Sequence, residues 1–309
     1  MHRILLVLTI LLSSSYSMIW AQERQAGTFV KTEIADGICH YLFEGMDEIS
    51  GAMQTVNVLR VDLDNENYKV VFSYGSDSTS SVALKHNALA AINATYETDA
   101  SYIRVNGKNH FEVSIPAGHL RYWKHDGALV LDGDRKMSIV HGASCHAASV
   151  EGGEAAIALY KSLGAPNIFS SSPMLIDNYE PVGTTFVPDP LEKPIKEYEY
   201  EDYRRHQGVR HPRVAVALTE DNDMLLVVVD GRWPSASGMS AKELTLFLAK
   251  HFNPRWALNM DGGGSSTMYL KGYGAPGNDV LNYPTDNKRY DHYGQRRVCT
   301  HILVCPAIN

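Results

Sequence analysis

Cysteine is scarce in this sequence, with four residues among 309, and none of their spacings is typical of a zinc site. Cys299 and Cys305 flank the apolar run Ile302–Val304, which we interpret as a strand. A straight strand separates their Cα atoms by about 20 Å, whereas a disulfide allows about 7 Å at most. These two cysteines are therefore not expected to pair with each other. A pairing with Cys39 or Cys145 stays open, as does a set of four free thiols.

Positive charge is also in short supply, because 28 Lys and Arg residues face 35 Asp and Glu residues, for a net charge of −7. This balance argues against a nucleic-acid backbone as the partner. Any bound anion must be held by local cations and backbone N–H groups. After the first 22 residues no apolar run approaches the roughly 20 residues that cross a bilayer, so no membrane span is predicted.

The first 22 residues predict a secretory signal peptide. Arg3 supplies a basic start, residues 4–12 are apolar except for Thr9, and a cleavage site follows Ala21. No cysteine lies just past that point to carry a lipid. We therefore expect export to the periplasm or the extracellular space, where disulfides are permitted.

Residues 23–309 are enough for one large domain or two small ones, and we favour one. Whether residues 23–80 form a small unit of that domain stays open. The segment from Pro181 to Pro212 is rich in proline, tyrosine and charge, which indicates a long insertion, either a functional flap or a solvated loop. A domain boundary there is the alternative. We favour an insertion because the strands that follow can complete the same sheet.

Predicted hairpins outnumber predicted helices, which favours an α+β fold around a mixed, largely antiparallel sheet with a few packed helices. A helix is predicted to open at Ser240, where Glu243 completes a capping box. The last third of the chain carries four short predicted strands, at Arg213–Leu218, Met224–Val229, Trp256–Met260 and Met268–Leu270.

The last two of these strands enclose the run Asp261-Gly262-Gly263-Gly264-Ser265-Ser266-Thr267. Three glycines free the backbone so that successive N–H groups can turn into one concavity that suits an anion. A carboxylate precedes them and three hydroxyls follow. Because apolar strands hold both ends, we interpret this loop as a functional site and not as a flexible tip.

Several common catalytic motifs are missing from this loop. The nucleophile elbow G-x-S-x-G lacks its second glycine, and no lysine follows the glycines as a phosphate-binding P-loop requires. The loop also lacks the G-x-G-x-x-G dinucleotide fingerprint, and the chain has no H-E-x-x-H zinc motif. The loop therefore calls for a different chemistry.

Four short motifs in order make the chain resemble the phosphodiester glycosidases. That family has an Arg-led strand, then V-V-D-G-R, a helix start G-M-[ST], and N-[LM]-D-G-G-G-S-S-T-M. The matching segments here are Arg213, Val228–Arg232, Gly238–Ser240 and Asn259–Met268. Upstream, the family's Ile-Asn-Gly-Gly-Phe-Phe is matched by Ile92–Tyr96, which keeps Asn93 but not the glycines, and its Gly-Gly-Gly-Pro by Ser170–Pro173.

The resemblance implies a hydrolase that removes a sugar such as N-acetylglucosamine from a phosphodiester on a glycan, without a required cofactor. On this basis Asp261 is the predicted nucleophile or general base, and Asp230 the second carboxylate that glycosidases usually need. Arg213 and the N–H groups of the loop are predicted to hold the phosphate. The predicted substrate-binding residues are Asn93, Arg232, Gly262, Gly263, Gly264, Ser265, Ser266 and Thr267.

Two other functions stay open at this point. One is a metal-dependent phosphodiesterase that cuts P–O, with Asp261 and Asp230 as oxygen ligands of a divalent cation. The other is a non-catalytic module that binds phosphoglycans. The segment 278–297, rich in Asn, Asp, Tyr and Arg, is either a lid over the site or plain surface.

Overall fold

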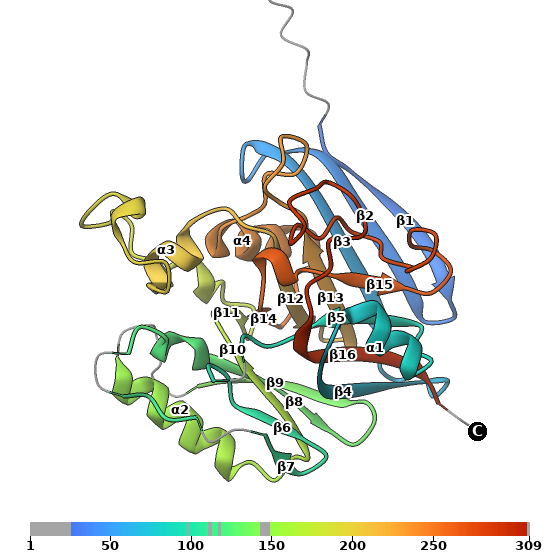
Figure 1. Ribbon diagram of the computed structural model, residues 1–309, viewed down its shortest axis with the longest axis horizontal. Helices are drawn as coiled ribbons and strands as arrows, with labels where there is room; N and C mark the ends of the chain where they lie inside the picture. The colour runs from blue at the N-terminus through green and yellow to red at the C-terminus, as the bar shows by residue number, and fades with distance from the viewer. Residues whose placement is uncertain (1–25, 98, 111–112, 117–118, 143–148, 308–309) are drawn as a thin grey trace, which may run out of the picture.

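The structure is a computed structural model that describes residues 26–97, 99–110, 113–116, 119–142 and 149–307 (Figure 1). The predicted signal peptide, residues 1–22, and Cys145 lie outside the described residues. Cys39, Cys299 and Cys305 are free thiols. Cys299 and Cys305 lie on one strand and do not pair with each other, as predicted.

Sixteen strands form three sheets, and every strand ladder in the described residues is antiparallel, which confirms the predicted fold class. The seven-stranded sheet runs β1 (Thr28–Ala35), β2 (Ile38–Asp47), β3 (Ala52–Asp62), β13 (Asp223–Val229), β12 (Arg213–Leu218), β14 (Trp256–Met260) and β11 (Met174–Asp177). The five-stranded sheet runs β7 (Lys108–Asn109), β6 (Ile103–Val105), β10 (Asn167–Ser171), β8 (Gly127–Asp132) and β9 (Lys136–His141). The four-stranded sheet runs β15 (Met268–Leu270), β5 (Ala90–Asn93), β16 (Val298–Pro306) and β4 (Tyr68–Asp77).

Within the described residues, four α-helices and four 3₁₀ turns connect these sheets. In Figure 1, α2 lies along the five-stranded sheet and α1 beside β5 and β16. None of the helices in the described part of the chain is long and apolar enough to cross a membrane. The helices are α1 (Thr79–Lys85), α2 (Val150–Ser162), α3 (Tyr203–Gly208) and α4 (Ala241–His251), and the turns are η1 (Tyr122–His125), η2 (Val182–Thr184), η3 (Ile195–Glu197) and η4 (Gly263–Ser265).

The central strands of the large sheet bury both of their faces. In β12 the larger residues Val214 and Val216 face the main core that the three sheets share, while Ala215 and Ala217 face the core under α4. Successive side chains of a strand point to opposite faces, so the valines and the alanines lie on opposite sides of the sheet. The small alanine side chains leave room for the helix, so α4 packs closely on this face of the sheet.

Three of the four predicted C-terminal strands are neighbours in one sheet, in the order β13, β12 and β14. The fourth, β15, lies in the four-stranded sheet instead, paired with β5. The loop 261–267 therefore leaves one sheet and enters another. Strands from residues 28–77 contribute to both of these sheets, through β3 beside β13 and β4 beside β16.

The segment 181–212 contains two short 3₁₀ turns and the helix α3, which packs near α4. Gly208, at the end of α3, packs against the side chain of Ile195 in the preceding turn. Glu201, His206 and His211 then reach the cavity beside Asp261. Residues 181–212 thus form a wall of the candidate site.

The capping box predicted at Ser240 is present and yields a stability prediction. The Ser240 Oγ accepts from the Glu243 N–H at 3.2 Å, and the Glu243 carboxylate accepts from the Ser240 N–H at 2.8 Å. Replacing Ser240 with Ala leaves the Glu243 N–H without its side-chain acceptor and should lower the free energy of unfolding by about 1 kcal/mol in urea. Lys242→Ala, in the same turn but paired only at the surface with Asp189, should change it by less than about 0.5 kcal/mol. Equal effects of the two substitutions would contradict the capping role.

Candidate active site

Asp261 lies directly after β14, at the junction of two cavities. The larger cavity has a volume of about 340 Å³ and the smaller about 60 Å³. Four of the lining residues are common to both cavities, namely Tyr96, Glu97, Asp261 and Arg296. A ligand that occupies both cavities would therefore lie next to these four residues, Asp261 among them.

The end of β5 fixes the loop that carries Asp261. The Asn93 side-chain amide donates to the Asp261 carbonyl at 2.7 Å, and its oxygen accepts from the Thr267 N–H at 3.0 Å. The carbonyl of Ala94 accepts the Asp261 N–H at 2.8 Å. Asn93 is fully buried, so it clamps the two ends of the loop and does not reach the cavities that Asp261 lines.

A side chain at each of the three loop glycines would meet a different steric or conformational restriction. A Cβ on Gly262 would lie 2.5 Å from the Pro212 carbonyl oxygen. Gly263 has a φ of +63°, a conformation that favours glycine, and donates its N–H to that same carbonyl at 2.8 Å. A Cβ on Gly264 would lie 2.7 Å from the Arg296 guanidinium. Contact with backbone therefore requires glycine at position 262 and the left-handed φ favours it at 263, whereas a Cβ at 264 would displace the ends of two side chains, Arg296 and Asp286.

The loop presents part of the predicted anion site. The Gly263 N–H is taken by Pro212, whereas the N–H groups of Gly262 and Gly264 have no hydrogen-bond partner among the described residues. Two guanidinium groups flank them, with Arg232 against Gly263 and Arg296 against Gly264. Arg232 has a left-handed φ of +70° and donates to the Thr285 hydroxyl at 3.2 Å, and Arg296 binds Asp286. Backbone donors and cations together suit a phosphate.

Burial dominates the electrostatics of Asp261. Loss of water raises the pKa of its carboxyl from 3.8 to about 7, and the negative charge of Glu97 acts in the same direction. A hydrogen bond from Ser265 and the cations Lys124 and Arg296 oppose the shift. The carboxyl can therefore gain or lose a proton near neutral pH, as an acid–base catalyst needs.

Arg213 forms part of the smaller cavity, but its guanidinium serves the fold. It donates to the carbonyls of Met239, His206 and Val209 at 2.9, 3.0 and 3.0 Å, and to the Gln207 side chain at 2.6 Å. Burial lowers its pKa to about 10, so it remains charged at neutral pH. Arg213 ties residues 181–212 to the start of α4, which leaves few of its N–H groups for a phosphate.

The structure does not bring Asp230 to either of the two cavities that Asp261 lines. Its buried carboxylate accepts from the Asn282 amide at 3.0 Å and from the Tyr283 N–H at 2.9 Å. Asn282 in turn accepts from the Met268 N–H and donates to the Ser266 carbonyl. Burial raises the Asp230 pKa to about 7. Asp230 thus stabilises the loop through Asn282.

The three hydroxyl residues of the loop have different surroundings. Ser265 contacts the Asp261 carboxyl and lines the larger cavity. Ser266 is buried, and its hydroxyl has no partner among the described residues. The Thr267 hydroxyl donates to the Ser265 carbonyl at 3.1 Å and is also buried. Of the three, Ser265 is the one placed to meet a ligand in this cavity.

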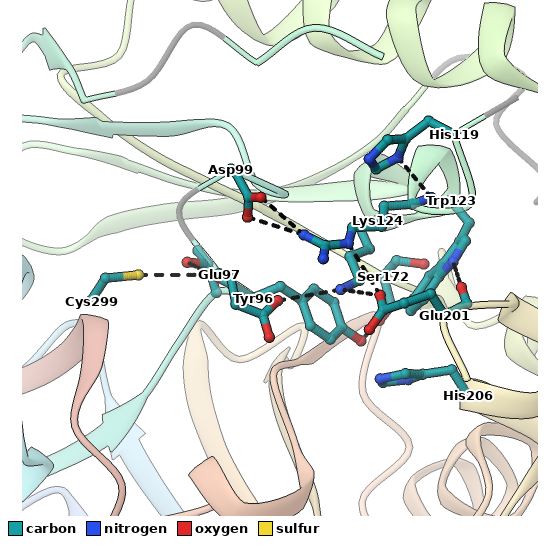
Figure 2. A network of polar contacts seen from close by, with 12 residues as sticks. Tyr96, Glu97, Asp99, His119, Trp123, Lys124, Ser172, Glu201, His206 and Cys299 are labelled. Atoms are coloured by element: carbon teal, nitrogen blue, oxygen red, sulfur yellow. Dashed lines mark hydrogen bonds and ion pairs between the residues drawn. The ribbon is translucent and has the colours of Figure 1, made fainter. Parts of the chain in front are cut away.

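Several residues at the site escaped the sequence analysis. Figure 2 shows Glu97, Lys124 and Glu201 grouped beside Tyr96, with His206 nearby. Lys124 is 1% exposed, and its Nζ lies 3.3 Å from Glu97 and 3.0 Å from Glu201. Glu97 follows Asn93 by four residues, so the partial motif match at residues 92–96 could have directed attention to it. Nothing in the sequence around Lys124 marks it as buried.

His211 also lines the smaller cavity, and both of its ring nitrogens are buried without a partner in the described structure. Burial lowers its pKa to about 3, helped by the charges of Arg213 and Arg232. The ring is therefore neutral at physiological pH. One nitrogen can donate a hydrogen bond to a ligand and the other can accept one.

Side chains that would hold a metal ion do not cluster at this site. Among the described residues, no group of three or more His, Cys, Asp or Glu side chains is arranged to bind a metal. Asp261 and Asp230, the two oxygen ligands considered above, line no common cavity of this site.

Comparison with solved structures identifies the same fold in other proteins. One is the catalytic domain of zebrafish N-acetylglucosamine-1-phosphodiester α-N-acetylglucosaminidase, auto-inhibited by its pro-peptide, at a TM-score of 0.59 and 17% identity over 91% of this chain and 88% of that one. Another is a hypothetical protein from Synechocystis, at a TM-score of 0.53 and 14% identity, covering 91% of this chain and 64% of that chain. No curated protein sequence matches this chain significantly.

Comparison with known protein families gives a match to the phosphodiester glycosidases over residues 86–305. The matched region contains β5 with Asn93, residues 181–212, which wall the smaller cavity, and the whole loop 261–267. Because this match spans well over half of the chain, the protein belongs to the phosphodiester glycosidase family.

Proposed function

We propose that this protein hydrolyses the bond between the anomeric carbon of a sugar and the phosphate of a phosphodiester. One observation carries the proposal: Asp261 lines both a small cavity that Lys124, Arg213, Arg232 and Arg296 also line and a larger one with room for a sugar. A sugar phosphodiester matches the order of the cavities, because its scissile C–O bond lies between the phosphate and the sugar ring. The family and the shared fold support a hydrolase of this kind.

The smaller cavity suits the phosphate. Lys124, Arg213 and Arg232 line it together with the three loop glycines. Lys124 is already paired with Glu97 and Glu201, and Arg213 with carbonyls, so Arg232 and the N–H groups of Gly262 and Gly264 are the better donors. Donors already fixed in position stabilise the charge that develops on a departing phosphate.

The larger cavity suits the sugar. Tyr74, Tyr96 and Val298 give it apolar surface, while Ser76 and Ser265 contribute hydroxyl groups. Sites for small polar ligands combine apolar walls with a few polar groups in this way. We propose an N-acetylglucosamine-type sugar, because the zebrafish relative is an N-acetylglucosamine-1-phosphodiester α-N-acetylglucosaminidase. We further propose that the chain is exported, on the basis of residues 1–22.

Purified protein should release free sugar from an N-acetylglucosamine-1-phosphodiester, and EDTA should leave the rate unchanged. Loss of turnover on chelation, with recovery on adding Mg²⁺ or Mn²⁺, would favour the metal-dependent phosphodiesterase. Binding of the substrate without turnover, by calorimetry, would favour a phosphoglycan-binding module.

Replacing Asp261 with Asn should reduce kcat by about 10²–10⁴-fold, because the amide cannot exchange a proton at the junction of the cavities. The fold should survive, since the Asn93 clamp binds the backbone of residue 261 and not its side chain. Initial rates and circular dichroism of the variant check both points. Asp132→Asn, an exposed carboxylate at the end of β8, is the control and should keep the wild-type rate. A wild-type rate in Asp261→Asn would remove Asp261 from the mechanism.

The same variant should gain stability at high pH. The folded state raises the Asp261 pKa to about 7, so ionising this group costs stability as the pH rises from about 4 through 7. Asn carries no charge and removes that cost. We expect the Tm of Asp261→Asn relative to wild type to be higher at pH 8 than at pH 5, measured by calorimetry. A Tm difference that does not change with pH would contradict the raised pKa.

A further inference from the structure

We propose that Glu97 is the second catalytic carboxylate of this site, acting across the junction of the two cavities from Asp261. This inference rests on the proposed hydrolysis of a sugar phosphodiester, and it gives Glu97 the role that the sequence analysis predicted for Asp230. Glu97 and Asp261 line both cavities, whereas the Asp230 carboxylate is directed to Asn282 and Tyr283.

The segment at the end of β5 holds the backbone of both Glu97 and Asp261 in place. Asn93 and Ala94 bind the backbone of Asp261, and Glu97 follows three residues after Ala94 on the same segment. The Glu97 side chain is 62% exposed, so a ligand or a water molecule can reach it. A movement of β5 would shift both groups together, which suits a pair that must keep a fixed spacing.

Lys124 is a positioning residue for Glu97. Its Nζ lies 3.3 Å from the Glu97 carboxylate, and the ammonium group lies over the Tyr96 ring at 4.6 Å from the centroid. Glu201 binds the other side of the ammonium group at 3.0 Å. With its side chain only 1% exposed, Lys124 has little freedom to move away from Glu97 (Figure 2).

The two carboxylates have opposite electrostatic surroundings. Partial loss of water on one side of Glu97 opposes its ionisation, but Lys124 and Arg121 outweigh this effect and lower the pKa of Glu97 below its usual value. Asp261 faces Glu97, Lys124 and Arg296, and its burial raises its pKa to about 7. At neutral pH Glu97 is therefore ionised while Asp261 can hold a proton. Environments that separate the pKa values of two carboxyls in this way are typical of an acid and a base.

With Glu97 ionised and Asp261 protonated, the two carboxyl groups can carry out the hydrolysis in one step. Glu97 takes a proton from water as the water oxygen forms a bond to the anomeric carbon. The bond from that carbon to the phosphate oxygen breaks, and its electron pair stays on the phosphate, which Asp261 protonates. The products are a free sugar of the opposite anomeric configuration and a phosphate monoester. A protonated Asp261 also avoids the repulsion that an ionised carboxylate would exert on a phosphate beside Gly262.

The test compares Glu97→Gln with Asp99→Asn, a carboxylate two residues away that pairs with Arg121 and lines neither of the cavities beside Asp261. Glu97→Gln should lower kcat by about 10²–10⁴-fold and remove the acidic limb of the pH–rate profile. Formate should restore turnover to Glu97→Ala, because a small carboxylate can enter the vacated position. Asp99→Asn should keep the wild-type rate and both limbs. A Glu97→Gln rate within threefold of wild type, an unchanged acidic limb, or retention of configuration in the released sugar would overturn the proposal.

A second measurement does not depend on turnover. The pKa of Asp261 is followed by ¹³C NMR of labelled carboxyl groups in the wild type and in Glu97→Gln. Removing the Glu97 charge should lower the Asp261 pKa, and an unchanged value would show that the two groups are not a pair. If the wild type releases no sugar from any sugar 1-phosphodiester, the proposed function fails. A coupled titration would then still establish the two carboxylates as one site for a different substrate.

Discussion

The close approach of several backbone segments to His211 and Pro212 is the constraint on which the site depends. The Pro212 carbonyl accepts the Gly263 N–H and lies where a Cβ of Gly262 would be. From other directions, a Cβ on Gly231 would lie 2.7 Å from the Pro212 nitrogen, and one on Gly238 would lie 2.5 Å from the His211 carbonyl oxygen. Three motifs that are separate in the sequence thus meet at one dipeptide, and each contributes a glycine to the contact.

This packing separates the residues that build the site from those that face a ligand. Asn93, Arg213 and Asp230 are buried, and their polar groups bind backbone or neighbouring side chains. They hold the loop, residues 181–212 and the segment after β15 in place. The cavities are lined by other motif residues, namely Asp261, Arg232, Gly262, Gly263, Gly264 and Ser265, and by Glu97, Lys124 and Arg296 from outside the motifs. The motifs thus supply residues that hold the site together as well as part of its lining.

The sequence predicted the local structure of the last third well because the signals there are local. The strand at Arg213–Leu218 and the capping box at Ser240 both depend on signals within a few residues, and both were confirmed. The division into three sheets was not predicted, since the pairing of β15 with β5 joins residues about 180 positions apart. The candidate site was predicted only in part, because some of its residues are far apart in the sequence. Asp261 and its glycines were found from one continuous run, whereas Lys124 and Glu97 reach it only through the fold.

Incorporation of ¹⁸O from labelled water tests the central claim most directly, because it identifies the bond that breaks. The wild-type protein would hydrolyse an N-acetylglucosamine-1-phosphodiester in H₂¹⁸O, and the label in each product would be measured by mass spectrometry. Attack at the anomeric carbon beside Asp261 predicts that the label enters the released sugar. Label in the phosphate would mean P–O cleavage and would contradict the account of a glycosidase.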